Sequence, residues 1–150
     1  MPTVEDVDAL AALLDRPTPS GTALYVRWSR GPAVDGVGNG GQASRDALTG
    51  VELPGLSANP LAPEPWWGDR SRRLWVARKL YDYEHMRRLR GPGVRPWVLA
   101  GEERGRGPDN EPLVLCREPV AWVSETALRQ CRQVVDHQDS PEWGPLRRTE

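Results

Sequence analysis

Apolar residues recur at intervals of three and four in three stretches of the chain, at about residues 4–15, 71–90 and 125–136. This spacing places the apolar side chains on one face of a helix. In the second stretch the apolar face comprises Leu74, Ala77, Leu80 and Tyr81, and in the third it comprises Leu128, Cys131, Val134 and Val135. The pattern therefore predicts three amphipathic helices.

Residues suited to cap a helix precede each of these stretches. Thr3 and Asp6 form an acidic variant of the capping box before the first helix. Asp69 is a suitable N-cap for the second helix, and Ser124 for the third. Gly91-Pro92 then ends the second helix, because proline cannot continue the helical hydrogen bonding.

In residues 24–28, purely apolar side chains alternate with side chains that carry a polar group, as expected for a strand. Leu24, Val26 and Trp28 share one face, and Tyr25 and Arg27 share the other. An arginine inside an apolar strand needs a carboxylate or phosphate partner. We interpret Arg27 as part of a salt bridge with Glu111 or an aspartate, as an outward-facing arginine, or as a residue that contacts a ligand.

Further short apolar runs predict a second group of strands, joined by turns at about 104–109 and 117–119. These connections are too short for crossovers, so neighbouring strands pair antiparallel. The expected fold is a compact α+β domain with mainly antiparallel strands and three helices. The predicted runs are 51–56, 96–100, 112–116 and 120–123.

The length of 150 residues is that of one domain. We expect a single α+β domain over 1–137, with a flexible Gly-rich loop at 31–50. The polar segment 138–150 is expected to be a poorly ordered tail, which Trp143 could tether.

Composition and charge exclude several classes of protein. The chain has no Phe and one lysine among its 20 basic residues, a bias that indicates a GC-rich, actinobacterial genome rather than a chemical role. The net charge is −1 and the pI about 6.2, so the protein has no overall positive potential that would attract nucleic acid.

No apolar run reaches the roughly 18 residues of a membrane span, and the start of the chain lacks a basic signal-peptide region. We expect a cytoplasmic protein without membrane association.

The residues that ligate metals are few and scattered. Cys116 and Cys131 form no C-x-x-C pair, and His85 and His137 lie far from both in sequence. We therefore expect no metal site. Among the carboxylates, Glu111 stands out because it lies between the turn 107–110 and an apolar strand, where it could face a cleft.

Three short motifs resemble those of the ADP-ribosyltransferase fold, in its Arg/Ser/Glu branch. They are L-Y-V-R-W-S at 24–29, G-L-S-A-N-P at 55–60 and D-N-E-P-L-V at 109–114. The resemblance implies a split sheet and an enzyme that consumes NAD, as a transferase or a glycohydrolase with an unknown acceptor. The second motif departs from the family, since Ser-Ala-Asn stands where better-defined members have Ser-Thr-Ser.

Transferred to this sequence, the resemblance implies a catalytic set of Glu111, Arg27 and Ser57. Arg27 would bind the phosphates or ribose of NAD, and Ser57 would brace the site. Glu111 would stabilise the positive charge that develops as the nicotinamide–ribose bond breaks. Aromatic side chains could stack on nicotinamide, and the candidates are Tyr25, Trp66 and Trp67.

A second hypothesis assigns no catalysis. The protein would then be a binding module that recognises a nucleotide or a protein partner through the Trp66-Trp67 region and the basic face of the second helix. The whole sequence also resembles an uncharacterised actinobacterial family of unknown function, which favours neither hypothesis.

Overall fold

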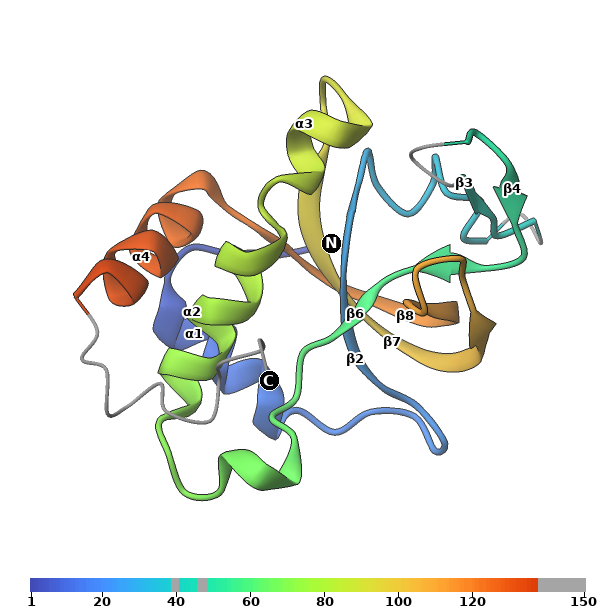
Figure 1. The fold of residues 1–150 in the computed structure, drawn as a ribbon. Coiled ribbons are helices and arrows are strands. Elements are labelled where there is room, and N and C mark those ends of the chain that lie inside the picture. The colour runs from blue at the N-terminus through green and yellow to red at the C-terminus, as the bar shows by residue number, and fades with distance from the viewer. Residues whose placement is uncertain (39–40, 46–48, 138–150) are drawn as a thin grey trace.

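The computed structural model describes residues 1–38, 41–45 and 49–137, and shows an α+β fold built on a curled, mostly antiparallel sheet (Figure 1). Five strands follow one another across the sheet, and only the first pair is parallel. In spatial order they are β1 (Thr3–Val4), β8 (Pro112–Val123), β7 (Arg95–Arg106), β2 (Ala23–Ser29) and β6 (Asn59–Pro60).

The hairpin of β7 and β8 is the longest element of the sheet. Its pairing runs from Trp97 opposite Trp122 to Arg106 opposite Pro112. The turn predicted at 117–119 is therefore wrong, because β8 continues through Pro119. Register shifts at Val98/Leu99 and Ala100/Gly101 leave Val120 and Arg117 of β8 as extra residues near Pro119, which cannot donate a ladder hydrogen bond.

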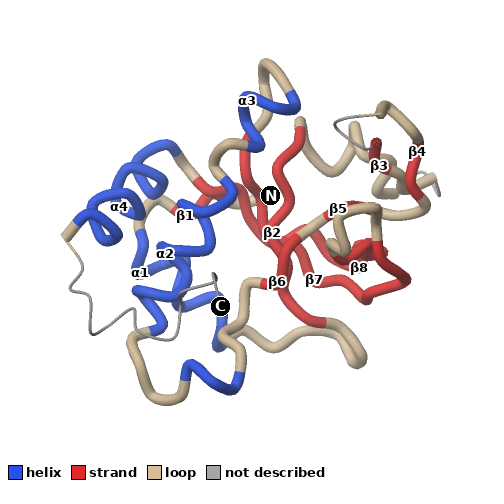
Figure 2. The backbone as a smooth tube through the Cα atoms, viewed as in Figure 1, coloured by secondary structure: helices blue, strands red, loops and turns tan. Residues whose placement is uncertain are grey.

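The segment that precedes the second helix closes the curl of the sheet. Here β5 (Leu56–Ser57) pairs with the first half of β8, and the adjacent β6 pairs with β2 on the other side. Residues 56–60 thus run between two strands that are not neighbours in the sheet (Figure 2).

Three helices cover one face of the sheet: α1 (Val7–Ala12), α2 (Arg72–Tyr83) and α4 (Glu125–Asp136) (Figure 1). The main core lies between them and the sheet. Its largest fully buried side chains include Trp28, Trp67, Leu10, Leu61, Leu80 and Leu128. As predicted, Leu24, Val26 and Trp28 of β2 face this core. No helix in the described ranges is long and apolar enough to cross a membrane.

A second, smaller core fills the inside of the curl, on the opposite face of β2. Tyr25 packs there with Trp97, and both side chains are buried. The remaining members are Leu56, Ala58, Leu99, Val114 and Cys116. The alternation within 24–28 therefore separates two cores rather than a core from solvent.

Two predicted helix starts are wrong. Asp6, rather than Thr3, caps α1, and its side chain accepts a hydrogen bond from the backbone N–H of Ala9 at 2.7 Å. Thr3 instead belongs to β1, where it pairs with Trp122. Ser71, rather than Asp69, caps α2, while Ser124 caps α4 as predicted.

The second predicted helix is two helices in the structure. α2 ends at Tyr83, and α3 (Met86–Arg90) follows after His85. Tyr81, expected on the inner face, is 40% exposed, and Trp75 and Val76 are buried in α2 instead. The break turns α3 away from α2 and places it against β2.

The Gly-rich segment contains local structure that its composition does not predict. β3 (Ser44–Arg45) pairs with β4 (Glu52–Leu53) in a separate two-stranded sheet. Residues 32–38 form turns, and Gly36 has φ +87°. The predicted tail at 138–150, with Trp143, lies outside the described residues.

Candidate functional site

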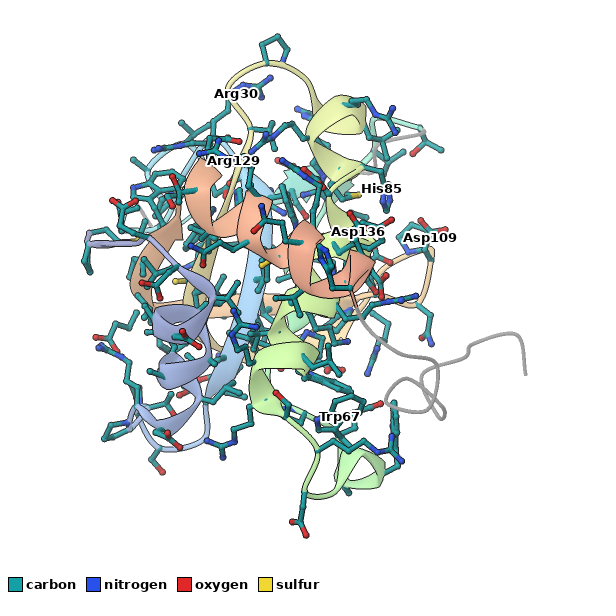
Figure 3. The ribbon with its side chains drawn as sticks, turned by 90° about the vertical axis from the view of Figure 1, so that its left-hand side faces the viewer. Arg30, Trp67, His85, Asp109, Arg129 and Asp136 are labelled. Atoms are coloured by element: carbon teal, nitrogen blue, oxygen red, sulfur yellow. The ribbon has the colours of Figure 1, made fainter. Side chains whose placement is uncertain are left out.

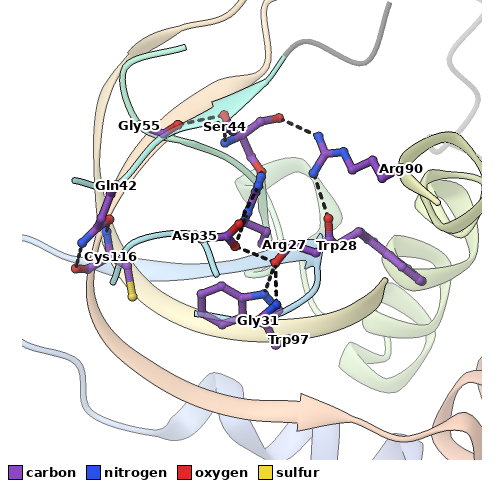
Figure 4. Close-up of polar contacts among 12 residues, drawn as sticks. Arg27, Trp28, Gly31, Asp35, Gln42, Ser44, Gly55, Arg90, Trp97 and Cys116 are labelled. Atoms are coloured by element: carbon purple, nitrogen blue, oxygen red, sulfur yellow. Dashed lines mark hydrogen bonds and ion pairs between the residues drawn. The ribbon is translucent and has the colours of Figure 1, made fainter. Parts of the chain in front are cut away.

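Arg27 is buried, only 5% exposed, and its partner is Asp35. The Arg27 Nε and Nη2 donate to the two Asp35 carboxylate oxygens at 2.7 and 3.1 Å, and Nη1 donates to the Ser57 carbonyl at 2.8 Å (Figure 4). Two oppositely charged groups with parallel hydrogen bonds form a strong pair. Of the sequence interpretations of Arg27, the salt bridge with an aspartate is the one found, and the buried side chain does not face outward.

Ser29 links this ion pair to the inner core. Its hydroxyl donates to Asp35 at 2.5 Å and accepts from the Trp97 indole N–H at 2.9 Å and from the Gly31 N–H at 3.1 Å. The chain therefore turns back after β2 and fixes residues 31–35 on the sheet. The Arg27 guanidinium faces protein groups, and a ligand would have to displace them.

A second arginine, Arg90, lies close to this network. It is the last residue of α3, and Arg30 fixes the end of that helix by donating to the carbonyls of Arg90 at 3.1 Å and Pro92 at 2.8 Å. The Arg90 side chain donates to the Trp28 carbonyl at 2.9 Å and to the Ser57 hydroxyl at 3.3 Å (Figure 4).

The charge of Arg90 has no carboxylate partner among the described residues. Both of its acceptors are neutral oxygens, and its Nε is buried without any acceptor in the part of the chain described. Burial, followed by the nearby charge of Arg27, lowers the pKa of Arg90 to about 10. The side chain is still protonated at neutral pH, so it is a partly desolvated cation.

Two cavities adjoin at Arg90. The first, the α3 cleft, has a volume of about 540 Å³ and lies between α3, the end of α2 and the turn that joins β7 to β8. The second has about 560 Å³ and lies between α3, the 31–36 turns and the β3–β4 pair. Arg45, Leu89 and Arg90 line both. These volumes fall within the range of small-molecule sites.

Both basic and acidic residues line the α3 cleft. His85 from the α2–α3 junction and Asp109 from the β7–β8 turn line it, and both lie at the same edge of the molecule in Figure 3. Glu111 and Ser57 also line this cleft. Two of the three residues in the predicted catalytic set thus share one cavity, while Arg27 lies behind Ser57 and lines the second cavity.

The turn before β8 holds the Glu111 carboxylate in place. Its Oε1 accepts from the Asp109 N–H at 3.0 Å, and the Gly107 N–H donates to the Glu111 carbonyl at 2.9 Å. A Cβ atom at Gly107 would lie 2.5 Å from this carboxylate, so a larger residue at this position would displace the Glu111 side chain. Asn110, at φ +62°, completes the turn. The Glu111 carboxylate is therefore hydrogen-bonded within its own turn.

The aromatic residues proposed from sequence lie elsewhere. Tyr25 is buried in the inner core, and burial raises the pKa of its hydroxyl. Trp67 is 1% exposed, donates to the Ser71 carbonyl, and lies away from His85 and Asp109 (Figure 3). Trp66 is 44% exposed and packs against Trp67 and Trp75. None of the three lines either cavity.

The described residues offer neither an activated thiol nor a metal cluster. Burial raises the pKa of Cys116 to about 11 and that of Cys131 to about 12, so both thiols stay protonated at neutral pH. Within the described ranges, no three His, Cys, Asp or Glu side chains are grouped so that they could hold a metal ion.

Arg90 is the site residue that the sequence does not single out. In the sequence it is one of six arginines on a predicted helix of twenty residues, whose basic face is interpreted either as solvated or as an anion-binding surface. Its position depends on the break at Glu84–His85 and on the contact of α3 with β2. Only its place directly before Gly91-Pro92 distinguishes it in the sequence.

Comparison with known proteins identifies a family. No curated protein and no solved structure is significantly similar to the chain. Residues 1–144 match the family described as "Family of unknown function (DUF6098)", and nothing in the match supports the resemblance to ADP-ribosyltransferases. Because the match spans nearly the whole sequence, the chain belongs to this family of unknown function, DUF6098.

Proposed function

We propose that the protein binds a phosphate-bearing small molecule at Arg90. The observation that carries the proposal is a partly buried guanidinium that donates two hydrogen bonds, both to uncharged oxygens. A guanidinium has five N–H donors and matches a phosphate group with parallel bonds. An anionic ligand would supply both the acceptors and the opposite charge.

The neighbouring arginines are engaged by protein groups. Arg27 is paired with Asp35, and Arg106 is paired with Glu103 at 3.0 Å. Arg45, which lines both cavities with Arg90, donates to the Gly50 carbonyl and adds a second positive charge. Two cations at one junction favour a doubly charged phosphate over a single carboxylate.

This proposal retains the binding function of the second sequence hypothesis but places the binding site at Arg90 instead of the Trp66-Trp67 region. Trp67 belongs to the core, and Trp66 lines neither cavity. The ligand site proposed here is the junction of the two cavities at Arg90, and the expected partner is a small anion.

Replacing Arg90 with glutamine is expected to weaken binding of pyrophosphate roughly 10- to 100-fold, because a hydrogen bond to a charged group contributes about 1.5–3 kcal/mol. Isothermal titration calorimetry of the wild-type and variant proteins measures the loss. Arg88→Gln is the matched control, since Arg88 lies on the same helix, is exposed, and lines neither cavity. Equal losses in the two variants would show a nonspecific charge effect and contradict the proposal.

Consumption of NAD is a second candidate function, favoured by one observation. Ser57 and Glu111 line the same cleft, and the Glu111 carboxylate is held at its edge by the turn. Such a carboxylate could stabilise the positive charge that develops on the ribose when the bond to nicotinamide breaks. Arg27 would position Ser57 through its carbonyl, since Asp35 occupies the rest of its guanidinium.

If the second candidate is correct, incubation with NAD releases nicotinamide, and Glu111→Gln abolishes the release. The variant keeps the Oε1 acceptor for the Asp109 N–H, so its thermal unfolding should match that of the wild type. Chromatographic quantification of nicotinamide measures the activity. Undiminished release from the variant would exclude the role of Glu111, and no release from the wild type would exclude the reaction.

A further inference from the structure

We infer that the ligand of the α3 cleft is a polyhydroxylated phosphate ester, of the sugar-phosphate class. The inference rests on the proposed function for its phosphate end and adds the chemistry of the other end. It is carried by the placement of a carboxylate held by its own turn, Glu111, in the cavity that Arg90 lines.

One oxygen of Glu111 is available to a ligand. Oε1 accepts from the Asp109 N–H, whereas Oε2 has no hydrogen-bond partner among the described residues. The turn holds the carboxylate against Gly107, at a residue that lines the cleft. A carboxylate held in this way is a pre-positioned acceptor for a hydroxyl group.

The charges that surround Glu111 narrow the class of ligand. Asp109 and Glu64 also line the α3 cleft, so three carboxylates line it together with basic residues. An apolar group placed beside the carboxylates would bury them without a donor. Hydroxyl groups avoid this cost, because they donate hydrogen bonds to the carboxylates.

The side-chain amides that line the cleft are also suited to bind hydroxyl groups. Asn59 from β6 and Asn110 from the turn line the cavity, and each carries both donors and an acceptor. Hydroxyl groups also donate and accept, so they can pair with amides and carboxylates at once. The cleft thus combines the Arg90 cation with carboxylate and amide acceptors suited to hydroxyl groups.

Two phosphate esters with the same three-carbon skeleton test this inference directly. Glycerol 3-phosphate carries two hydroxyl groups that n-propyl phosphate lacks. The wild-type protein is expected to bind glycerol 3-phosphate about tenfold more tightly than n-propyl phosphate, the effect of one hydrogen bond to a charged group. Ribose 5-phosphate should bind at least as tightly as glycerol 3-phosphate. Calorimetry gives all three dissociation constants.

The variants separate the two ends of the ligand. Glu111→Gln should reduce the tenfold preference to less than about threefold, with the affinity for n-propyl phosphate unchanged or slightly higher. Arg90→Gln should weaken both esters by the same factor. Glu118→Gln, which removes a carboxylate outside the α3 cleft, should change neither.

The results distinguish the anion site at Arg90 from the hydroxyl recognition by Glu111. Binding of n-propyl phosphate that depends on Arg90, without any gain from the hydroxyl groups, would overturn this inference and leave the anion site in place. A preference for hydroxyl groups that survives Glu111→Gln would also overturn it. If neither ester binds, the proposed function itself fails.

Discussion

Replacing Asp35 with alanine is expected to reduce the free energy of unfolding by about 3–5 kcal/mol. The reason is that the variant leaves the Arg27 guanidinium buried, 5% exposed, without its carboxylate. The loss also removes the acceptor of the Ser29 hydroxyl, which ties residues 31–35 to β2. Urea denaturation followed by circular dichroism measures the change.

The matched control for this variant is an exposed ion pair. Glu118 pairs with Arg16 at 2.6 Å, with about two fifths of each side chain exposed, and Glu118→Ala should cost no more than about 1 kcal/mol. The double variant Arg27→Met/Asp35→Ala should lose much less free energy of unfolding than the sum of the losses of the two single variants, because it leaves no unpaired buried charge. Additive losses would contradict a coupled, buried pair.

Replacing Trp97 with alanine is expected to cost about 3–5 kcal/mol. Trp97 is fully buried at the centre of the inner core, and its indole N–H donates to Ser29. Trp97→Phe keeps most of the ring but loses that donor, so its loss should be about 1–2 kcal/mol. Urea denaturation measures both variants.

Trp66→Ala is the comparison variant for Trp97. The Trp66 ring is 44% exposed and packs on one side only, against Trp67 and Trp75. Its removal should cost clearly less than that of Trp97. A loss below about 1 kcal/mol for Trp97→Ala would mean that the inside of the curled sheet is not a packed core.

The alternation of side chains along β2 correctly predicted which face of this strand packs against the helices. Leu24, Val26 and Trp28 face the helices as expected, and the strands after residue 95 pair antiparallel. The sequence could not show that Tyr25 and Arg27 also face inward, because that depends on residues 56–60 closing the curl between β8 and β2. The periodicity of side chains shows which residues share a face of a strand, but it does not show which part of the protein covers that face.

The site was less predictable than the fold for a related reason. Asp35, the partner of Arg27, lies in a segment read from sequence as a Gly-rich loop, and nothing local marks it as buried. Arg90 reaches the site only because the second predicted helix breaks at Glu84–His85. Glu111 and Ser57, by contrast, border strands that the sequence predicted, and they do share a cleft.

The claim that an anion binds at Arg90 is tested most directly by observing that side chain. In a ¹H–¹⁵N spectrum, the Nε–H resonance of Arg90 should shift saturably as pyrophosphate is added, with the dissociation constant found by calorimetry. The indole N–H of Trp67, which lies away from the cleft, should stay in place. An Arg90 resonance that does not move at pyrophosphate concentrations far above that constant would contradict the account.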